Sequence, residues 1–260
     1  MINEAIKVDK LTKKFGKFTA VDDLSFSVPN GEFFGFLGPN GAGKSTTMRM
    51  LSTLLKPTSG QAWVNGFEIQ EHPDDVRRSI GFAMQSVTLD TLANAWENLL
   101  FLGALYGDSK AKAKKRATEL LELMELTKHA DKWIKSYSGG MRRRLDLAAV
   151  LMHEPKVLFL DEPTEGLDPS GRRVIWQYLK KLGKDHGTTV FLTTHYMDEA
   201  NYLCERLAII DKGKIVVDGS PKDLKKQVGG NLDDVFIHYT GHGIQDETTD
   251  SKAADPYVRI

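Results

Sequence analysis

One short motif constrains this chain more than any other feature. Residues 38–46 fit the spacing G-x-x-x-x-G-K-[ST]; an apolar run at 33–37 precedes them and a helical pattern from Thr46 to Leu55 follows. A glycine-rich turn between a strand and a helix points successive backbone N–H groups at one place, which suits an anion. The sequence therefore predicts a loop that binds a triphosphate. The predicted contact residues are Gly38, Pro39, Asn40, Gly41, Ala42, Gly43, Lys44, Ser45 and Thr46.

Two side chains of this loop have predicted roles of their own. Lys44 can reach the β- and γ-phosphates of a nucleotide, and the Ser45 hydroxyl can ligate Mg²⁺. An ordinary flexible turn is the alternative, but the strand before the loop and the helix after it favour a nucleotide site. In that helix we expect one buried face. Its predicted members are Met48, Leu51, Leu54 and Leu55.

Composition excludes several classes of protein. The 260 residues carry 35 basic and 35 acidic side chains, so no overall positive charge points to a nucleic acid partner. The single cysteine, Cys204, excludes an internal disulfide framework and fits a reducing cytosol. The longest apolar stretch, 99–106, is far shorter than the ~20 residues that cross a bilayer. We therefore expect any role at a membrane to depend on a partner protein.

The spacing of apolar residues predicts mixed α/β structure. The first 30 residues alternate as β-strands do, and Asn65-Gly66 between apolar residues predicts a hairpin. From Leu92 the pattern becomes helical, and a second amphipathic helix follows over 113–124. Short apolar runs at 157–160 and 189–192, with a helix around 172–182 between them, predict a mostly parallel sheet with crossover helices. The first helical stripe contains Leu92, Trp96, Leu99 and Gly103.

An acidic pair follows one of the predicted strands. Four apolar residues, 157–160, lead directly to Asp161 and Glu162. At the carboxyl end of a buried strand Asp161 can hold Mg²⁺, usually through water. Glu162 would then polarise a water molecule for in-line attack on the γ-phosphorus, which favours hydrolysis over transfer to a hydroxyl substrate. A strand that ends in an acidic turn is common, but beside a phosphate loop the functional interpretation is stronger.

A third segment reads Tyr137-Ser138-Gly139-Gly140-Met141 and opens a helix. Exposed N–H groups at a helix N-terminus form an anion site, although Ser-Gly-Gly considered alone is more often a plain helix cap. Its place shortly before the strand of Asp161 favours the functional interpretation.

Taken in order, these motifs resemble those of the ATP-binding cassette (ABC) ATPases, from about Ile2 to Val217. The loop and 160–162 resemble the two nucleotide motifs of the family, and 137–141 resembles its signature. Gln85 resembles the Q-loop glutamine, which is expected near Mg²⁺ and at the joint with a helical subdomain. His195 resembles the switch histidine that contacts the γ-phosphate. Leu167-Asp168 is similar to the D-loop, and Phe15 to the aromatic residue that stacks on adenine.

The resemblance implies an α/β fold with three parts. These are a P-loop NTPase (RecA-like) core with a mostly parallel sheet, an N-terminal antiparallel β-subdomain and an inserted α-helical subdomain. We expect the ATPase domain to span 1–225, with the helical subdomain at about 86–150, and a C-terminal helix with a polar tail to span 226–260. Within this site the expected catalytic residues are Lys44, Gln85, Glu162 and His195, and the expected metal ligands are Ser45, Gln85 and Asp161.

The resemblance also implies partners and a location. Two ATPase subunits, expected to be identical chains, would pair head to tail, and Ser138, Gly139 and Gly140 of one would complete the ATP site of the other. An integral-membrane permease subunit is the second expected partner, which places the chain in the cytoplasm, at the inner face of the membrane. The expected small molecules are ATP and Mg²⁺, and no nucleic acid is expected.

Two positions depart from the usual family pattern. Tyr137 and Met141 stand where leucine and glutamine are usual in the signature, and Glu165 stands where the D-loop usually has a small residue. The Tyr-Ser-Gly-Gly-Met form is similar to that of drug exporters of the daunorubicin type, as is the segment 232–236. A soluble cassette ATPase, such as one serving iron–sulfur assembly, remains the alternative. A GTPase is disfavoured because Asn-Lys-x-Asp is absent.

Overall fold

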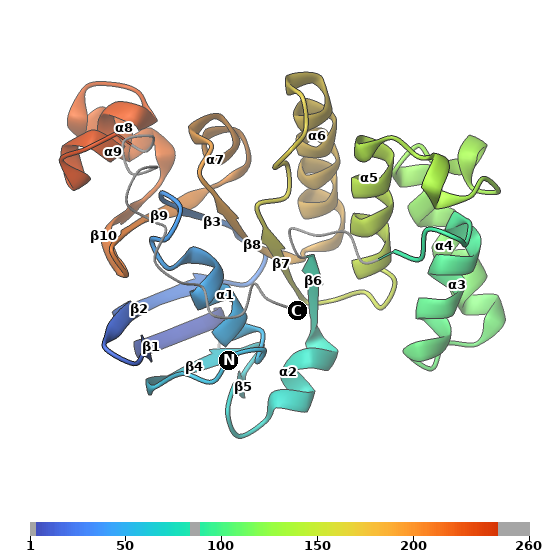
Figure 1. Ribbon diagram of the computed structural model, residues 1–260, viewed down its shortest axis with the longest axis horizontal. Helices are drawn as coiled ribbons and strands as arrows, with labels where there is room; N and C mark the ends of the chain where they lie inside the picture. The colour runs from blue at the N-terminus through green and yellow to red at the C-terminus, as the bar shows by residue number, and fades with distance from the viewer. Residues whose placement is uncertain (1–3, 84–88, 244–260) are drawn as a thin grey trace.

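The computed structural model describes residues 4–83 and 89–243, which form two sheets and the helices around them (Figure 1). The smaller sheet is antiparallel, in the order β2-β1-β4-β5. Its hairpin between β4 and β5 turns at Asn65-Gly66, where both residues have positive φ, as the sequence predicts. The strands are β1 (Glu4–Phe15), β2 (Phe18–Pro29), β4 (Ser59–Val64) and β5 (Phe67–Glu68).

The larger sheet has the order β10-β9-β3-β8-β7-β6 and is parallel except for the β9–β10 pair. Parallel strands place their carboxyl ends at one edge of the sheet, so β3, β7 and β8 bring three distant segments together there. The strands are β3 (Phe33–Leu37), β6 (Ile80–Ala83), β7 (Val157–Asp161), β8 (Thr189–Thr194), β9 (Arg206–Asp211) and β10 (Lys214–Gly219).

Some helices cover the larger sheet, and others lie beyond it at the two ends of the molecule. In Figure 1, α3, α4 and α5 lie together at one end of the molecule, and α8 and α9 lie at the other. The helices are α1 (Lys44–Leu51), α2 (Pro73–Ser79), α3 (Ala95–Leu105), α4 (Lys110–Leu123), α5 (Gly139–Val150), α6 (Pro169–His186), α7 (Met197–Leu203), α8 (Pro221–Val228) and α9 (Leu232–Thr240).

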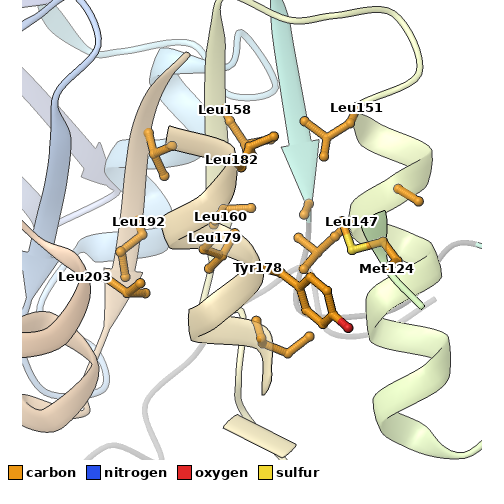
Figure 2. Close-up of a cluster of buried hydrophobic side chains, with 14 of the residues drawn as sticks. Met124, Leu147, Leu151, Leu158, Leu160, Tyr178, Leu179, Leu182, Leu192 and Leu203 are labelled. Atoms are coloured by element: carbon orange, nitrogen blue, oxygen red, sulfur yellow. The ribbon is translucent and has the colours of Figure 1, made fainter. Parts of the chain in front are cut away.

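Two apolar clusters lie on opposite faces of the larger sheet. On one face, leucines of β7 and β8 pack against α6 and, further along, against Leu147 of α5 and Leu151, which follows that helix (Figure 2). On the other face, Phe34, Phe36 and Phe191 pack beneath the antiparallel sheet and α1. Burial on both faces explains why the central strands are continuous apolar runs. This architecture confirms the predicted fold class.

Two predicted helix boundaries are wrong. The first predicted helix face included Leu54, but α1 ends at Leu51 and the Leu54 side chain is 58% exposed. The chain leaves the helix because Thr53 adopts a positive φ of 66°. The helix predicted from Leu92 also begins later than expected. Leu92 is 72% exposed and precedes α3, so it belongs neither to the helix nor to its buried face.

The start of α3 has a local cause. Asn94 caps the helix by accepting a hydrogen bond from the backbone N–H of Glu97, and the Glu97 carboxylate accepts one from the N–H of Asn94. This reciprocal pair fixes the first helical residue at Ala95. The predicted domain boundary at 225 falls inside α8, and the limits of the helical subdomain stay a prediction.

Candidate functional site at the carboxyl edge of the parallel sheet

The glycine-rich loop joins β3 to α1, as its sequence predicts. Two of its glycines stand where no side chain fits: a Cβ on Gly38 would lie 2.3 Å from the carbonyl oxygen of Ile210, and one on Gly43 2.5 Å from that of Ala20. Gly41 has open space but a φ of +83°, which L-residues rarely adopt. The spacing of glycines therefore follows from close packing at two positions and backbone conformation at the third.

The Lys44 side chain is enclosed within the loop. Its ammonium donates hydrogen bonds to the carbonyl oxygens of Gly38 and Pro39, at 2.7 and 3.0 Å. It also lies 3.3 Å from Oε1 of Glu162. Burial lowers the pKa of Lys44, and the neighbouring Glu162 carboxylate acts in the opposite direction. A buried positive charge is thus held where the loop begins its turn.

Asp161 lies at the end of β7 and faces the first turn of α1. Its Oδ1 atom accepts hydrogen bonds from the hydroxyls of Ser45, at 3.0 Å, and Thr193, at 2.6 Å. Asp161 is 7% exposed, so its carboxylate has little contact with solvent. The two predicted metal ligands that the structure describes, Ser45 and Asp161, are therefore adjacent. The third, Gln85, lies outside the described residues.

Glu162 has a constrained backbone. Its φ is +47°, a conformation that costs about 1–3 kcal/mol for a residue other than glycine. The N–H of Glu162 donates to both Oγ1 and the carbonyl oxygen of Thr193, at 3.1 and 3.2 Å, and these bonds hold the conformation. The carboxylate is thereby directed away from the strand and toward Lys44 and His195.

The Glu162 carboxylate lies between two cationic or potentially cationic groups. Oε1 faces Lys44, and Oε2 is 3.3 Å from Nδ1 of His195, close enough for an ion pair but without hydrogen-bond geometry. Burial alone would raise the pKa of Glu162, but the His195 ring and the Lys44 ammonium outweigh it and hold the pKa well below its ordinary value. Glu162 is therefore ionised at neutral pH.

The predicted signature segment lies in a different place. Ser138 caps α5 by accepting a hydrogen bond from the N–H of Met141 at 3.2 Å. Ser138, Gly139 and Gly140 line a cavity of about 480 Å³ together with Leu167, Asp168 and the first turn of α6. Among the described residues, none of 38–46 lines this cavity. Within one chain, the two predicted anion sites are separate.

Phe15 ends β1 in the hairpin with β2, where it pairs with Phe18. The ring is partly buried, and the ammonium of Lys13 lies 5.2 Å from its centre. The same β2 strand reaches the nucleotide loop, because Ala20 is the residue that a side chain on Gly43 would meet. The hairpin that carries Phe15 therefore packs against the nucleotide loop through β2.

Several residues of this edge were not predicted from the sequence. Thr193 bonds both acidic residues, and the buried Arg143, Thr164 and Glu199 hold the loop that follows Glu162. Thr193 stands two positions before His195, and this closeness in the sequence is the one local indication that it belongs to the site. The bonds by which the other three hold this loop, from Arg143 to Pro163 and from Thr164 to Glu199, span at least 20 residues, and no local pattern marks them.

The described residues contain no group of three or more His, Cys, Asp or Glu side chains able to hold a metal by themselves. Nor does any helix within 4–83 and 89–243 have the length and apolar character needed to span a bilayer.

Comparison with known proteins shows the family of the chain. Residues 21–165 match the family described as ABC transporter. The chain is 47% identical to the daunorubicin/doxorubicin resistance ATP-binding protein DrrA of Streptomyces peucetius, over 90% of this chain and 71% of that protein. It is 43% identical to the linearmycin resistance ATP-binding protein LnrL of Bacillus subtilis, over 93% of this chain and 76% of that one.

A solved structure gives the same result for the fold. The dimeric post-hydrolysis state of the ATP-binding cassette MJ0796, bound to ADP and Pi, superposes with a TM-score of 0.74 at 30% identity, over 83% of this chain and 98% of that one. The chain belongs to the ABC transporter family, and it is the ATP-binding domain of such a system.

Proposed function

We propose that the chain binds ATP with Mg²⁺ at the carboxyl edge of its parallel sheet and hydrolyses it to ADP and phosphate. The observation that carries the proposal is the convergence of Lys44, Asp161 and Glu162 there. Lys44 is a cation within an anion-binding loop, and Asp161 is a buried carboxylate beside the Ser45 hydroxyl. Glu162 is an ionised carboxylate that makes no bond to Ser45 or to the Asp161 carboxylate. Three functions that hydrolysis requires are thus available within one small region.

Residues 38–46 would hold the phosphates. The N-terminus of α1 supplies backbone N–H groups and the positive end of the helix dipole, which attract negative charge. Lys44 lies against the loop carbonyls, a position from which its ammonium can contact the β- and γ-phosphates. Phe15, on the hairpin beside the loop, would stack on adenine.

The donor set at Ser45 and Asp161 fits Mg²⁺. Both offer oxygen atoms, 3.0 Å apart, and Mg²⁺ is commonly held by one or two protein oxygens together with waters and substrate phosphates. A larger cluster of protein ligands is not needed for such a site. When bound, the metal neutralises charge that develops on the phosphate oxygens. Gln85 is proposed as a further ligand.

Glu162 would act on the attacking water. Its carboxylate accepts a proton from the water as the oxygen attacks the γ-phosphorus, and the bond from the γ-phosphorus to the bridging oxygen breaks, so that ADP leaves with the electron pair. His195, 3.3 Å from the same carboxylate, would contact the γ-phosphate and orient Glu162. The constrained backbone at Glu162 supports this role, because such strain often accompanies a functional site.

A second copy of the chain would complete each site. Ser138, Gly139 and Gly140 line a cavity that the chain's own nucleotide loop does not reach, so they are available to a nucleotide held by a partner. The dimeric form of a cassette with the same fold supports the pairing of two chains. ATP would favour closure because it contacts both chains only in the closed dimer.

The work of hydrolysis would be used by an integral-membrane permease subunit. Relatives named for resistance to daunorubicin, doxorubicin and linearmycin support an exporter of drugs or other small molecules. The ATPase would then lie on the cytoplasmic face of the membrane, bound to the permease.

The test is to copurify the chain with the membrane protein encoded beside it and to measure phosphate release in lipid nanodiscs. We expect Mg²⁺-dependent ATP hydrolysis that an exported compound, such as daunorubicin, stimulates. Hydrolysis that no exported compound alters, with a chain that does not bind its membrane neighbour, would contradict the transport role. ATP turnover that persists without Mg²⁺ would contradict the assignment of Ser45 and Asp161.

A further inference from the structure

A buried carboxylate, that of Glu199, contacts the loop that follows Glu162 and lies outside the proposed nucleotide site. Glu199 belongs to α7, the short helix that begins two residues after His195, and its side chain is 0% exposed. A buried carboxyl group is costly unless it is hydrogen-bonded. Its partners therefore indicate why it stands there.

Glu199 joins two separate elements. Its Oε1 atom accepts a hydrogen bond from the Thr164 hydroxyl at 2.8 Å and another from the Trp176 indole N–H at 2.9 Å. Thr164 belongs to the loop that follows Glu162, and Trp176 belongs to α6. Burial raises the pKa of Glu199. Both contacts use one side-chain oxygen of Glu199 as the acceptor.

The same loop is held from its other side by α5. The Arg143 guanidinium, 6% exposed, donates from Nε to the carbonyl oxygen of Pro163 at 2.8 Å, and its NH1 group lies 3.1 Å from Asp146. Residues 163–164 are thus fixed between α5, which begins after Ser138, and α7, which follows His195. Residues 166–168, further along the same loop, line the cavity that Ser138 also lines.

We propose that Glu199 is a positioning residue that transmits movement of the His195 strand end to residues 163–168, and through them to the cavity that would receive the partner's nucleotide. The inference rests on the proposed function, since it assumes that His195 responds to the γ-phosphate. The path is short: α7 begins at Met197 and carries Glu199 in its first turn, so a shift of the strand end moves the Oε1 atom. Thr164, bonded to that atom, moves with it.

The variant that tests this path is Thr164→Val, which removes the hydroxyl and keeps the shape of the side chain. The matched control is Thr189→Val. Thr189 is also buried, at the start of β8, and its Oγ1 accepts one hydrogen bond from the N–H of Gly31 at 2.8 Å. Both variants lose a buried hydrogen bond of a threonine, but Thr189 lies at the opposite edge of the sheet from the site.

We expect kcat for ATP hydrolysis to fall about 10- to 100-fold in Thr164→Val, the size of effect that small misplacement of catalytic groups produces, with KM for ATP changed less than about twofold. Thr189→Val should keep kcat within about twofold of the wild type. Glu199→Gln, which retains an acceptor oxygen, should keep most of the activity that Glu199→Leu loses. Equal losses of kcat in Thr164→Val and Thr189→Val, or in the Gln and Leu variants, would overturn the inference.

Hydrogen exchange separates this inference from the proposed function. In the wild type, Mg²⁺-ATP should slow exchange of amides in both 38–46 and 163–168. In Thr164→Val, protection should persist at 38–46 and be lost at 163–168. Protection of both segments in the variant would overturn the role of Glu199 and leave the nucleotide site intact. No protection of 38–46 in the wild type would overturn the nucleotide site, and the inference with it.

Discussion

Ser45 and Asp161 lie 116 residues apart in the sequence, yet the Ser45 hydroxyl donates a hydrogen bond to Oδ1 of Asp161 at 3.0 Å. This contact depends on the parallel pairing of β7 with β8 and of β8 with β3, which sets the ends of the three strands at one edge. It brings together the two oxygen atoms proposed to hold Mg²⁺.

Replacement of Asp161 by asparagine tests the metal site. Asp161→Asn keeps the shape of the side chain and an oxygen for Ser45 but removes the charge that attracts a divalent cation. We expect the Mg²⁺ concentration needed for half-maximal phosphate release to rise by at least about tenfold, while ATP affinity measured without metal stays within about threefold. An unchanged Mg²⁺ requirement would contradict the assignment.

Removal of the Lys44 ammonium should weaken ATP binding. Lys44→Ala loses the one side-chain cation enclosed by the described loop residues, and we expect ATP affinity in titration calorimetry to fall by about 10- to 100-fold, because a charge-assisted contact to phosphate contributes about 1.5–3 kcal/mol. Lys181→Ala, at an exposed position of α6, is the matched control and should bind normally. Equal affinity of the two variants would exclude the loop as the phosphate site.

Acid should remove the stabilisation that the Glu162 cluster provides. The pKa of Glu162 is lowered in the folded chain from the ordinary 4.5, so the folded state gains stability from its ionised form above that pH. As the pH falls below 4.5 toward the lowered pKa, this contribution is lost. In urea titrations, the free energy of unfolding of the wild type should exceed that of Glu162→Gln at pH 7, and the difference should shrink between pH 4.5 and pH 3. A difference that grew on acidification would contradict the ion-pair account.

Two alanine variants of the loop separate packing from backbone conformation. Gly41→Ala meets open space at a φ of +83°, and should cost about 1 kcal/mol of unfolding free energy from strain alone. Gly43→Ala adds a contact of 2.5 Å with the Ala20 carbonyl oxygen at a φ of +104°, and should cost at least about 2 kcal/mol more. Denaturant titration of both variants measures the difference. Equal costs would mean that the close approach of β2 to the loop is not maintained in solution.

Local patterns predicted much of this edge. The apolar runs before Gly38 and Asp161 correspond to β3 and β7, because buried parallel strands are apolar on both faces. Each motif therefore stands at a strand end, where the strand itself positions it. The spacing of glycines likewise reflects the local path of the loop.

Contacts between distant segments were beyond the reach of such patterns. The acceptor of the Thr164 hydroxyl is 35 residues away and that of the Arg143 Nε is 20 residues away, and neither spacing has a sequence signature. The start of α3 could have been found, since Asn94 and Glu97 have the spacing of a capping box. Leu92 continues the apolar repeat of that helix, so the repeat alone includes it, although the cap at Asn94 sets the first turn after it.

The most direct test of the central claim is the behaviour of Glu162→Gln with Mg²⁺-ATP, measured by phosphate release and by light scattering after size exclusion. The account predicts that the variant binds ATP, releases phosphate about 10²- to 10⁴-fold more slowly than the wild type, and accumulates as a dimer that is absent without ATP. Phosphate release near the wild-type rate, from a variant that stays monomeric with ATP, would contradict it.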